Sequence, residues 1–260
     1  MTAMTSTEAA RLSLACLDLT SLNDADTEAD IARLCERARA PLGPVAAVCV
    51  WPRLAAFARA QLPAHIGVAA VANFPDGGTD VEHAVRDAGE IVQAGAQEVD
   101  VVLPWRALQA GDEAAVAAVL RSVRRACEGL TLKVILESGE LGATGDMTLI
   151  SRASRLALAE GADFLKTSTG KTTRHASLRA AEAMLMAIAS DPQARERVGL
   201  KPSGGLRTVA EVQPYLALVA QHLGAGALNP QRFRIGASSL YADIEAILSG
   251  NSSAPTGSIY

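Results

Sequence analysis

The chain has 260 residues, of which 49% are hydrophobic and 20% are charged, a composition typical of a globular protein with a large core. The net charge is −4 and no basic block interrupts the sequence, which argues against nucleic acid or a membrane surface as a partner. No apolar run approaches the roughly 20 residues that span a bilayer, and the first residues lack the positive region of a signal peptide. We therefore expect a cytoplasmic protein.

Short apolar runs recur along the chain and predict eight β-strands. They lack a strict alternation of apolar and polar residues, which is typical of parallel strands that are covered on both faces. The predicted strands cover residues 16–19, 46–50, 66–72, 98–104, 132–138, 163–168, 198–202 and 232–236.

Longer segments rich in alanine, leucine and arginine separate these runs and predict helices. Acidic residues come early and arginines late in several of them, which suits the helix dipole, and glycines 95, 161 and 224 stand where helices are expected to end. The clearest helical segments are residues 24–40, 80–95, 112–127, 149–161, 177–189 and 208–224.

Strands that alternate with helices over this length predict one (β/α)8 TIM barrel, which we assign to residues 1–249. An open doubly wound sheet is the alternative, but no G-x-G-x-x-G follows an early strand. Residues 250–260, rich in glycine, serine and proline, are predicted to form a flexible tail.

Cysteine and histidine give no sign of a metal or redox centre. The four cysteines and four histidines are scattered, without a C-x-x-C or H-x-x-x-H pattern. We predict no metal and no cofactor, and free buried thiols in a reducing compartment.

Lysine is rare in this chain, and its positions are informative. Of the 24 Lys and Arg residues only Lys133, Lys166, Lys171 and Lys201 are lysine. Arginine stays protonated, whereas a lysine amine in its neutral form is a nucleophile that forms Schiff bases with carbonyl compounds. An arginine-rich chain must therefore keep lysine wherever a neutral amine is required.

Lys166 lies inside an apolar strand and is the candidate nucleophile, with a buried, ion-paired lysine as the alternative. A free lysine has a pKa of about 10.4, so the reaction needs an environment that destabilises the ammonium by about 4 kcal/mol at neutral pH. Lys201, at nearly the same height in the next strand, is expected to supply a positive charge that does so. It could instead be a plain phosphate-binding lysine, and Lys133, at the start of its strand, is expected to be structural.

Asp100 is an acid within an otherwise apolar strand. It is either a structural partner for a barrel lysine or a general acid/base, acting directly or through water. Burial raises the pKa of a carboxyl and neighbouring lysines lower it, and the sequence leaves open which effect prevails.

Two turns of small residues are candidate phosphate sites, because backbone N–H groups at such turns bind anions. "KPSGGLRT" places Gly204 and Gly205 after a strand, and "RIGASSLYADI" does the same with Gly236, Ser238 and Ser239. In barrels the last loops commonly build this site. "TSTGKTT" adds a glycine and a lysine on the preceding loop, and it lacks the first glycine of a Walker A motif.

Eight segments together resemble the signature segments of the deoxyribose-phosphate aldolase family, in the same order and spacing. They are "CLDLTSLNDADT", "AAVCVWPR", "VANFPDGG", "EVDVVLPWRAL", "LKVILESGEL", "GADFLKTSTGK", "GLKPSGGLRT" and "FRIGASSL", spread from about residue 17 to about residue 241.

This resemblance implies a class I aldolase that cleaves 2-deoxy-D-ribose 5-phosphate reversibly to acetaldehyde and D-glyceraldehyde 3-phosphate. Lys166 matches the Schiff-base lysine, Lys201 the lysine that perturbs it and Asp100 the acid/base. Tyr260 matches a terminal tyrosine that takes part in proton transfer, while Ser203 stands where we expect alanine. With the turns above, the expected substrate and phosphate site comprises Asp18, Thr20, Cys49, Thr169, Gly170, Lys171, Gly204, Gly205, Gly236, Ser238 and Ser239.

Two other functions remain open from the sequence. Another class I aldolase would share the lysine and the phosphate site, and a sugar-phosphate-binding barrel would share the phosphate site without catalysis. Adjacent lysines favour an enzyme, because arginine serves phosphate binding equally well. We also expect a homo-oligomer, and the resemblance to the family implies a dimer.

Overall fold

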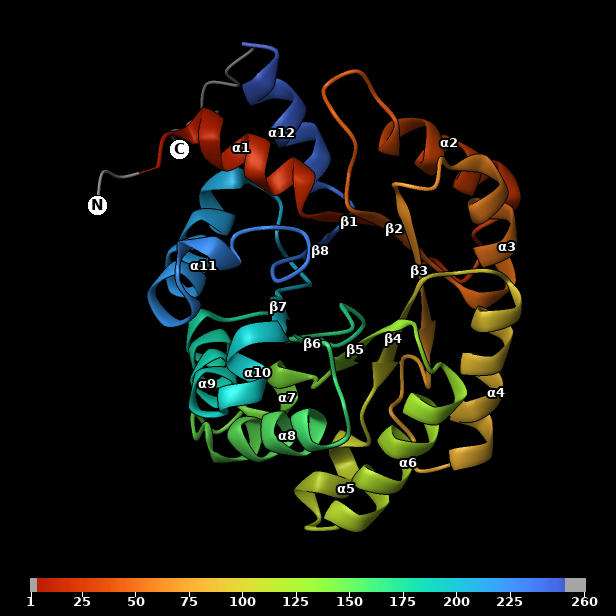
Figure 1. Cartoon of the computed structure of the whole chain (residues 1–260), viewed down its shortest axis with the longest axis vertical. Helices are drawn as coiled ribbons and strands as arrows, with labels where there is room; N and C mark the ends of the chain where they lie inside the picture. Colours follow the sequence, from red (N-terminus) through yellow and green to blue (C-terminus); the bar gives the residue numbers. More distant parts are fainter. Residues whose placement is uncertain (1–3, 251–260) are drawn as a thin grey trace, which may run out of the picture.

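The computed structural model describes residues 4–250, and its strands form a single sheet rolled into a barrel. Figure 1 looks down the barrel, with the strands around the centre and the helices outside them. The strands are β1 (Leu17–Thr20), β2 (Ala47–Val50), β3 (Gly67–Ala72), β4 (Glu98–Val102), β5 (Thr131–Ile135), β6 (Phe164–Lys166), β7 (Gly199–Lys201) and β8 (Ile235–Ala237).

The barrel is continuous from β7 through β6, β5, β4, β3, β2 and β1 to β8, and every neighbouring pair is parallel. Parallel bridges between Leu200 and Phe233 and between Ser203 and Gly236 join β7 to β8. The sequence prediction of a (β/α)8 TIM barrel is therefore confirmed.

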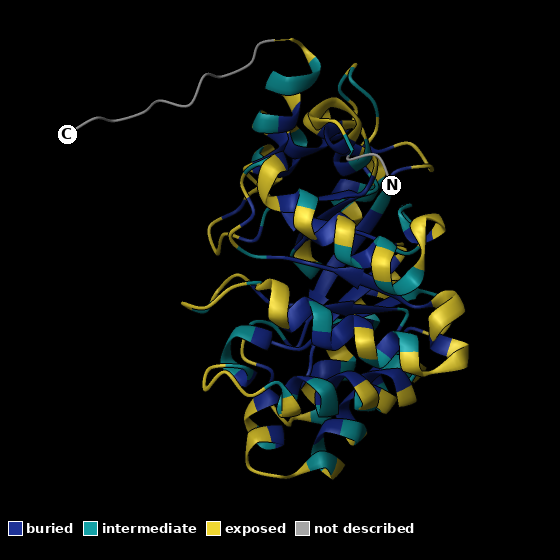
Figure 2. Cartoon of the chain, turned by 90° about the vertical axis from the view of Figure 1, so that its left-hand side faces the viewer, coloured by how far each residue is buried: buried dark blue, intermediate teal, exposed yellow. Residues whose placement is uncertain are grey.

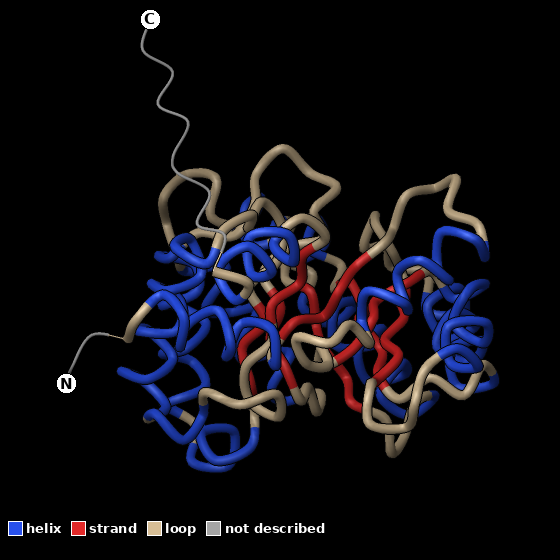
Figure 3. The backbone as a smooth tube through the Cα atoms, turned by 90° about the horizontal axis from the view of Figure 1, so that it is seen from above, coloured by secondary structure: helices blue, strands red, loops and turns tan. Residues whose placement is uncertain are grey.

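Helices connect the strands and cover the outside of the barrel. Figure 3 shows them around the central strands, with loops at the two ends. The helices are α1 (Ser6–Ala15), α2 (Glu28–Ala38), α3 (Pro52–Gln61), α4 (Val81–Gln93), α5 (Trp105–Gln109), α6 (Glu113–Ala126), α7 (Ser138–Leu141), α8 (Thr148–Ala159), α9 (Leu178–Ser190), α10 (Pro192–Arg197), α11 (Val209–Leu223) and α12 (Leu240–Leu248), and a 3-10 turn covers Ala225–Ala227.

Local chemistry explains where many helices begin and end. Thr27 and Thr208 cap α2 and α11 in capping boxes, each with an acidic residue three positions later. Gly95, Gly161 and Gly224 follow their helices with φ of 73°, 86° and 86°, a backbone conformation that favours glycine. The predicted helix ends are therefore correct at these three glycines.

All eight predicted strands exist, and the boundary errors have local reasons. β4 ends at Val102, short of the predicted 104, since Pro104 has no N–H to donate. β5 ends at Ile135, short of the predicted 138, because Glu137 turns the chain with a φ of 53°. The predicted helical segments include neither the short helices α5, α7 and α10 nor the longer α1, α3 and α12.

Burial follows this architecture. Figure 2 shows the buried residues gathered inside and the exposed ones on the outer faces of the helices. The apolar core is one large cluster between strands and helices, and a small one lies inside the barrel around Cys49, Ala69 and Val71. Much of the rest of the barrel interior is occupied by charged side chains instead of apolar ones.

Candidate active site

The candidate catalytic residues lie on neighbouring strands of one half of the barrel. Lys166, the last residue of β6, is paired in register with Lys201, the last residue of β7. The sequence placed these two lysines at nearly the same height, and the register confirms it. Asp100, in the middle of β4, is in register with Lys133 on β5.

Asp100 is the hub of a buried ion network. Its Oδ2 lies 2.8 Å from the Nζ of Lys166 and 2.7 Å from the Nζ of Lys201, while its Oδ1 lies 2.9 Å from the Nζ of Lys133. Lys201 also contacts Asp18 Oδ2 at 2.5 Å. The side chains of Asp100, Asp18, Lys133 and Lys201 are fully buried, so water screens these interactions little.

A deeper layer of the network completes it from the residue before β8 and the start of β4. Arg234 contacts Asp18 Oδ1 at 2.7 Å and Glu98 Oε1 at 2.7 Å, and Glu98 also pairs with Lys133. The sequence analysis missed both Glu98 and Arg234. The available signal was a charged residue inside an apolar strand, the same signal that identified Asp100.

The network holds four cations against three carboxylates, since Asp18, Glu98 and Asp100 face Lys133, Lys166, Lys201 and Arg234. Among the described residues, Lys166 has one carboxylate partner, and it shares that oxygen with Lys201. Each of the other three cations contacts at least two carboxylates. Lys166 is therefore the cation that the network neutralises least.

The protonation states follow from the same contacts. Burial alone would raise the pKa of Asp100, but the ammonium groups of Lys133, Lys166 and Lys201 outweigh it and hold that pKa well below its usual value. Burial lowers the pKa of Lys201, yet the carboxylates of Asp100 and Asp18 prevail and raise it. Asp100 is thus ionised and Lys201 is an ammonium at neutral pH.

A cavity of about 380 Å³ opens above this network, at the carboxyl ends of β1, β6, β7 and β8. Lys166 is 3% exposed and lines it, so of the network's charged residues it is the one that reaches the cavity. Of the residues expected from the sequence, the cavity is also lined by Thr20, Thr169, Gly170, Lys171, Gly204, Gly205, Gly236, Ser238 and Ser239.

One side of the cavity has the features of an anion site. Gly170, Gly204 and Gly205 have φ of 79°, 85° and 79°, conformations that favour glycine and that leave backbone N–H groups free to turn toward a ligand. Lys171 and Arg207 line the same cavity and supply positive charge. His175, which the sequence analysis did not single out, lines it as well.

Ser203 ties together the ends of β6 and β7 below this anion site. Its hydroxyl donates to the carbonyl of Ser168 at 2.5 Å, and its backbone N–H donates to Thr167 Oγ1 at 2.9 Å. A Cβ on Gly236 would lie 2.7 Å from the Cβ of Ser203, so β8 needs glycine at that position. The serine found where alanine was expected thus fastens two loops of the site.

The other expected residues lie beneath the cavity or outside the described chain. Asp18 and Asp100 are buried in the ion network, and Cys49 lies with its Sγ 3.8 Å from Asp100 Oδ2. Burial and the nearby Asp100 raise the pKa of that thiol. Tyr260 and the tail residues 251–260 lie outside the residues that the structure describes.

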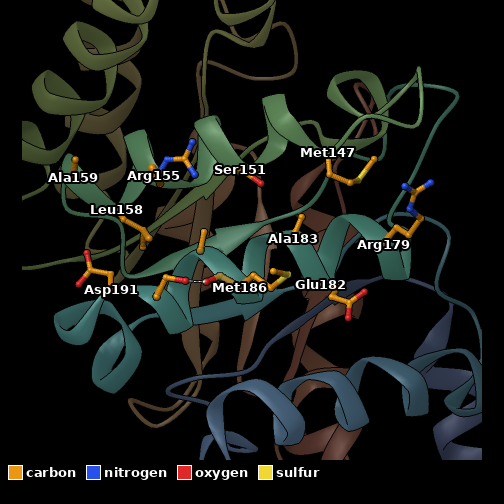
Figure 4. A pocket seen from close by; sticks show the side chains of 12 residues that line it. Met147, Ser151, Arg155, Leu158, Ala159, Arg179, Glu182, Ala183, Met186 and Asp191 are labelled. Atoms are coloured by element: carbon orange, nitrogen blue, oxygen red, sulfur yellow. Dashed lines mark hydrogen bonds between the residues drawn. The ribbon is translucent and has the colours of Figure 1, made fainter.

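A second cavity, of about 620 Å³, lies between α8 and α9 on the outside of the barrel. Figure 4 shows Met147 and Arg155 on its α8 side and Arg179 and Met186 on its α9 side. It contains none of the candidate catalytic residues. The barrel-end cavity is therefore the candidate active site.

Neither a metal cluster nor a membrane-spanning helix is found in residues 4–250. Within residues 4–250 no group of three or more His, Cys, Asp and Glu side chains is arranged to hold a metal ion. Over the same range, no helix combines the length and the apolar character required to cross a membrane.

Comparisons with known proteins agree with this geometry. A deoxyribose-phosphate aldolase of Agrobacterium fabrum is 45% identical over 256 residues, which are 97% of this chain and 96% of that protein. A crystal structure from Toxoplasma gondii ME49, assigned as a deoxyribose-phosphate aldolase, superposes with a TM-score of 0.85 at 26% identity and covers 95% of this chain and 96% of that one.

A tetrameric deoxyribose phosphate aldolase from Aeropyrum pernix shares the fold, with a TM-score of 0.68 at 23% identity over 94% of this chain and 93% of that one. The profile of the DeoC/LacD family of aldolases matches residues 12–246. By this match, and by its identity to the Agrobacterium enzyme, the chain belongs to the DeoC/LacD aldolase family.

Proposed function

We propose that this aldolase, an aldehyde-lyase of deoxyribose phosphate catabolism, cleaves 2-deoxy-D-ribose 5-phosphate reversibly through a Schiff base on Lys166. The observation that carries the proposal is the position of Lys166 in the ion network. It lines the cavity and shares its one described carboxylate oxygen with a second ammonium. The substrate follows from the Agrobacterium relative and from the anion site beside the lysine.

The charge balance supports a neutral amine at this position. With Lys166 neutral, three carboxylates face three cations, whereas with Lys166 protonated the buried network carries one excess positive charge. An excess charge in a medium of low dielectric constant is unfavourable. Burial lowers the pKa values of Lys133 and Lys201, but their carboxylate partners outweigh it and raise them, so these two lysines keep their protons.

The reaction then proceeds by known imine chemistry. The neutral amine of Lys166 attacks C1 of the open-chain sugar, and loss of water leaves an iminium cation beside the Asp100 carboxylate. The C3 hydroxyl gives up its proton to a base, the C2–C3 bond breaks, and its electron pair enters the iminium to form an enamine. Glyceraldehyde 3-phosphate leaves, the enamine is protonated at carbon, and water releases acetaldehyde and the amine.

Asp100 and Lys201 are our candidates for the proton transfers. Asp100 is ionised, so it acts as a base or as a partner for the iminium, and water in the cavity carries protons between it and the C3 oxygen. Lys201 stays protonated and keeps the Asp100 carboxylate in place. Tyr260, outside the described residues, is proposed to protonate the enamine carbon, and a Tyr260→Phe variant tests this by slowed deuterium exchange into acetaldehyde.

The phosphate is proposed to bind on the glycine-rich side of the cavity. The backbone of Gly170, Gly204 and Gly205 and the turn at Ser238–Ser239 would surround it, and Lys171 would neutralise part of its charge. In this proposal the phosphate lies at one end of the cavity and the sugar's C1 lies at Lys166.

Borohydride reduction in the presence of acetaldehyde tests the function directly. We expect a mass gain on the peptide that contains Lys166, and no turnover in Lys166→Arg, which keeps the charge but has no neutral amine. A gain on Lys201 instead would exchange the two roles. A folded protein without any gain would be a sugar-phosphate-binding barrel and not a class I aldolase.

Assembly and location complete the proposal. We infer a homo-oligomer, a dimer, as expected from the sequence, and light scattering during size-exclusion chromatography tests it. We also infer a cytoplasmic location, since the four cysteines are free and buried, as in proteins of a reducing compartment.

A further inference from the structure

We propose that the turn after β5, through Glu137 and Gly139, positions the anion-binding loop of residues 169–175 and thereby sets the preference for a phosphorylated substrate. Neither residue lines the cavity, so both act through the loop. The inference rests on the proposed function, because it assumes that this loop binds the substrate's phosphate.

Glu137 is a buried carboxylate whose hydrogen bonds all go to the loop. It is fully buried, and its Oε2 accepts from the Thr169 hydroxyl at 2.5 Å and from the Thr169 N–H at 3.3 Å. The Thr172 hydroxyl lies 3.4 Å from its Oε1 and 3.0 Å from the carbonyl oxygen of Arg174. No cation of the described chain pairs with it, so the loop's hydroxyl and amide groups are what offset the burial of this acid.

The backbone of Glu137 is also unusual. Its φ of 53° and ψ of 53° put a residue with a side chain in the left-handed region, which is uncommon outside glycine. Such strained positions recur at ligand clamps, where the surrounding contacts maintain them. The turn thus aims the carboxylate back across the end of β6 instead of along the barrel wall.

Thr169 links Glu137 to the residues that line the cavity. Its hydroxyl, while donating to Glu137, accepts from the backbone N–H of Lys171 at 3.0 Å. The two bonds fix the turn that carries Gly170 between them. A shift of the Glu137 carboxylate would therefore move the peptide groups of Gly170 and the root of the Lys171 side chain.

Gly139 holds the far end of the same loop by close contact. A Cβ at Gly139 would lie 2.5 Å from the carbonyl oxygen of Arg174, so no other residue allows the loop to come so near. The next residue, His175, in turn packs on the second glycine turn, because a Cβ at Gly204 would lie 3.2 Å from its Nδ1. The β5 turn thus positions both glycine turns of the anion site.

Kinetics with two substrates separate positioning of the phosphate from a general role in folding. The variants are Glu137→Ala, Glu137→Gln and Gly139→Ala, assayed with 2-deoxyribose 5-phosphate and with 2-deoxyribose. Gly89→Ala is the matched glycine control, since nothing lies within 4 Å of a Cβ there, and the exposed Glu128→Gln is the matched acid control. Borohydride trapping of acetaldehyde reports on Lys166 without any phosphate.

We expect Glu137→Ala to raise the KM for the phosphorylated substrate about tenfold or more, the usual effect of losing hydrogen bonds to a charged group. Its kcat/KM for 2-deoxyribose and its acetaldehyde trapping should stay within about twofold of the parent protein. Glu137→Gln, which keeps an acceptor oxygen, should restore much of the loss. Gly139→Ala should show the same split, and both controls should show none.

Equal losses with both substrates, or an unchanged KM for the phosphorylated one, would overturn the proposal. If Glu137→Ala does not fold, the KM values of Glu137→Gln and Gly139→Ala for the two substrates decide the question. If none of the three variants folds, the turn has a structural role only, and the proposal is wrong. A parent protein that fails to trap acetaldehyde would instead refute the proposed function. The two failures are therefore distinguishable.

Discussion

Replacing Lys201 by methionine is the sharpest test of the electrostatic reasoning. Methionine has nearly the length of the lysine stem but no charge, so the substitution removes the ammonium that touches both Asp100 and Asp18. Without it, one fewer cation opposes the three carboxylates, and the network then favours the protonated form of Lys166. We expect fewer neutral Lys166 amines at neutral pH and a slower reaction.

The contacts set the size of the effect. The Nζ atoms of Lys166 and Lys201 lie 2.8 and 2.7 Å from the same oxygen of Asp100, which keeps them within about 5.5 Å of each other. At an effective dielectric constant of about 20, that separation gives a repulsion of about 3 kcal/mol. Its loss lowers the fraction of neutral Lys166 about a hundredfold.

The assay is the rate of borohydride-trapped acetaldehyde adduct from pH 6 to pH 10, measured on protein shown to be folded by circular dichroism. The rate of Lys201→Met at pH 7 should fall about a hundredfold and approach the parent rate as pH rises, because alkali restores the neutral amine. Breaking a buried ion pair costs about 3–5 kcal/mol, a large part of the usual 5–15 kcal/mol of stability.

Lys133→Met is the matched control for that loss of stability. It removes an equally buried cation, one that contacts the other oxygen of Asp100. A folded Lys201→Met protein that traps acetaldehyde at the parent rate at pH 7 would refute the electrostatic argument.

Three further outcomes follow from the structure. Because the network lowers the pKa values of Asp18 and Asp100, their contribution to stability is full above about pH 5 and is lost as the pH falls below about 4; acid unfolding followed by circular dichroism should show it, and a stability that is flat down to pH 2 would contradict it. Gly199→Ala should lower stability by about 1–3 kcal/mol or more in urea unfolding, because its Cβ would lie 2.5 Å from the Arg232 carbonyl oxygen, whereas Gly89→Ala, in open space, should not. Lys171→Met should raise the KM for 2-deoxyribose 5-phosphate but not for 2-deoxyribose, and equal effects on both would remove Lys171 from the phosphate site.

Local sequence patterns were enough to predict the barrel and the height of its lysines. Each strand is a short apolar run bounded by turn residues, so its place in the sequence is visible to within a few residues, and Lys166 and Lys201 fall near the ends of adjacent predicted strands. Glycines at turns were visible for the same reason, since their backbone conformations depend on neighbouring residues only.

Which side chains contact one another depended on the closed barrel. Arg234 meets Glu98 across 136 positions of sequence, and Asp100 meets Lys201 across 101, so no local pattern records either pair. Burial raises the pKa of Asp100 and the neighbouring lysines lower it, so its protonation state depends on every charge that the barrel encloses. The sequence by itself determined where each strand lies along the chain, and the tertiary structure decided which charged side chains pair, because buried charges interact over distances that only the closed barrel sets.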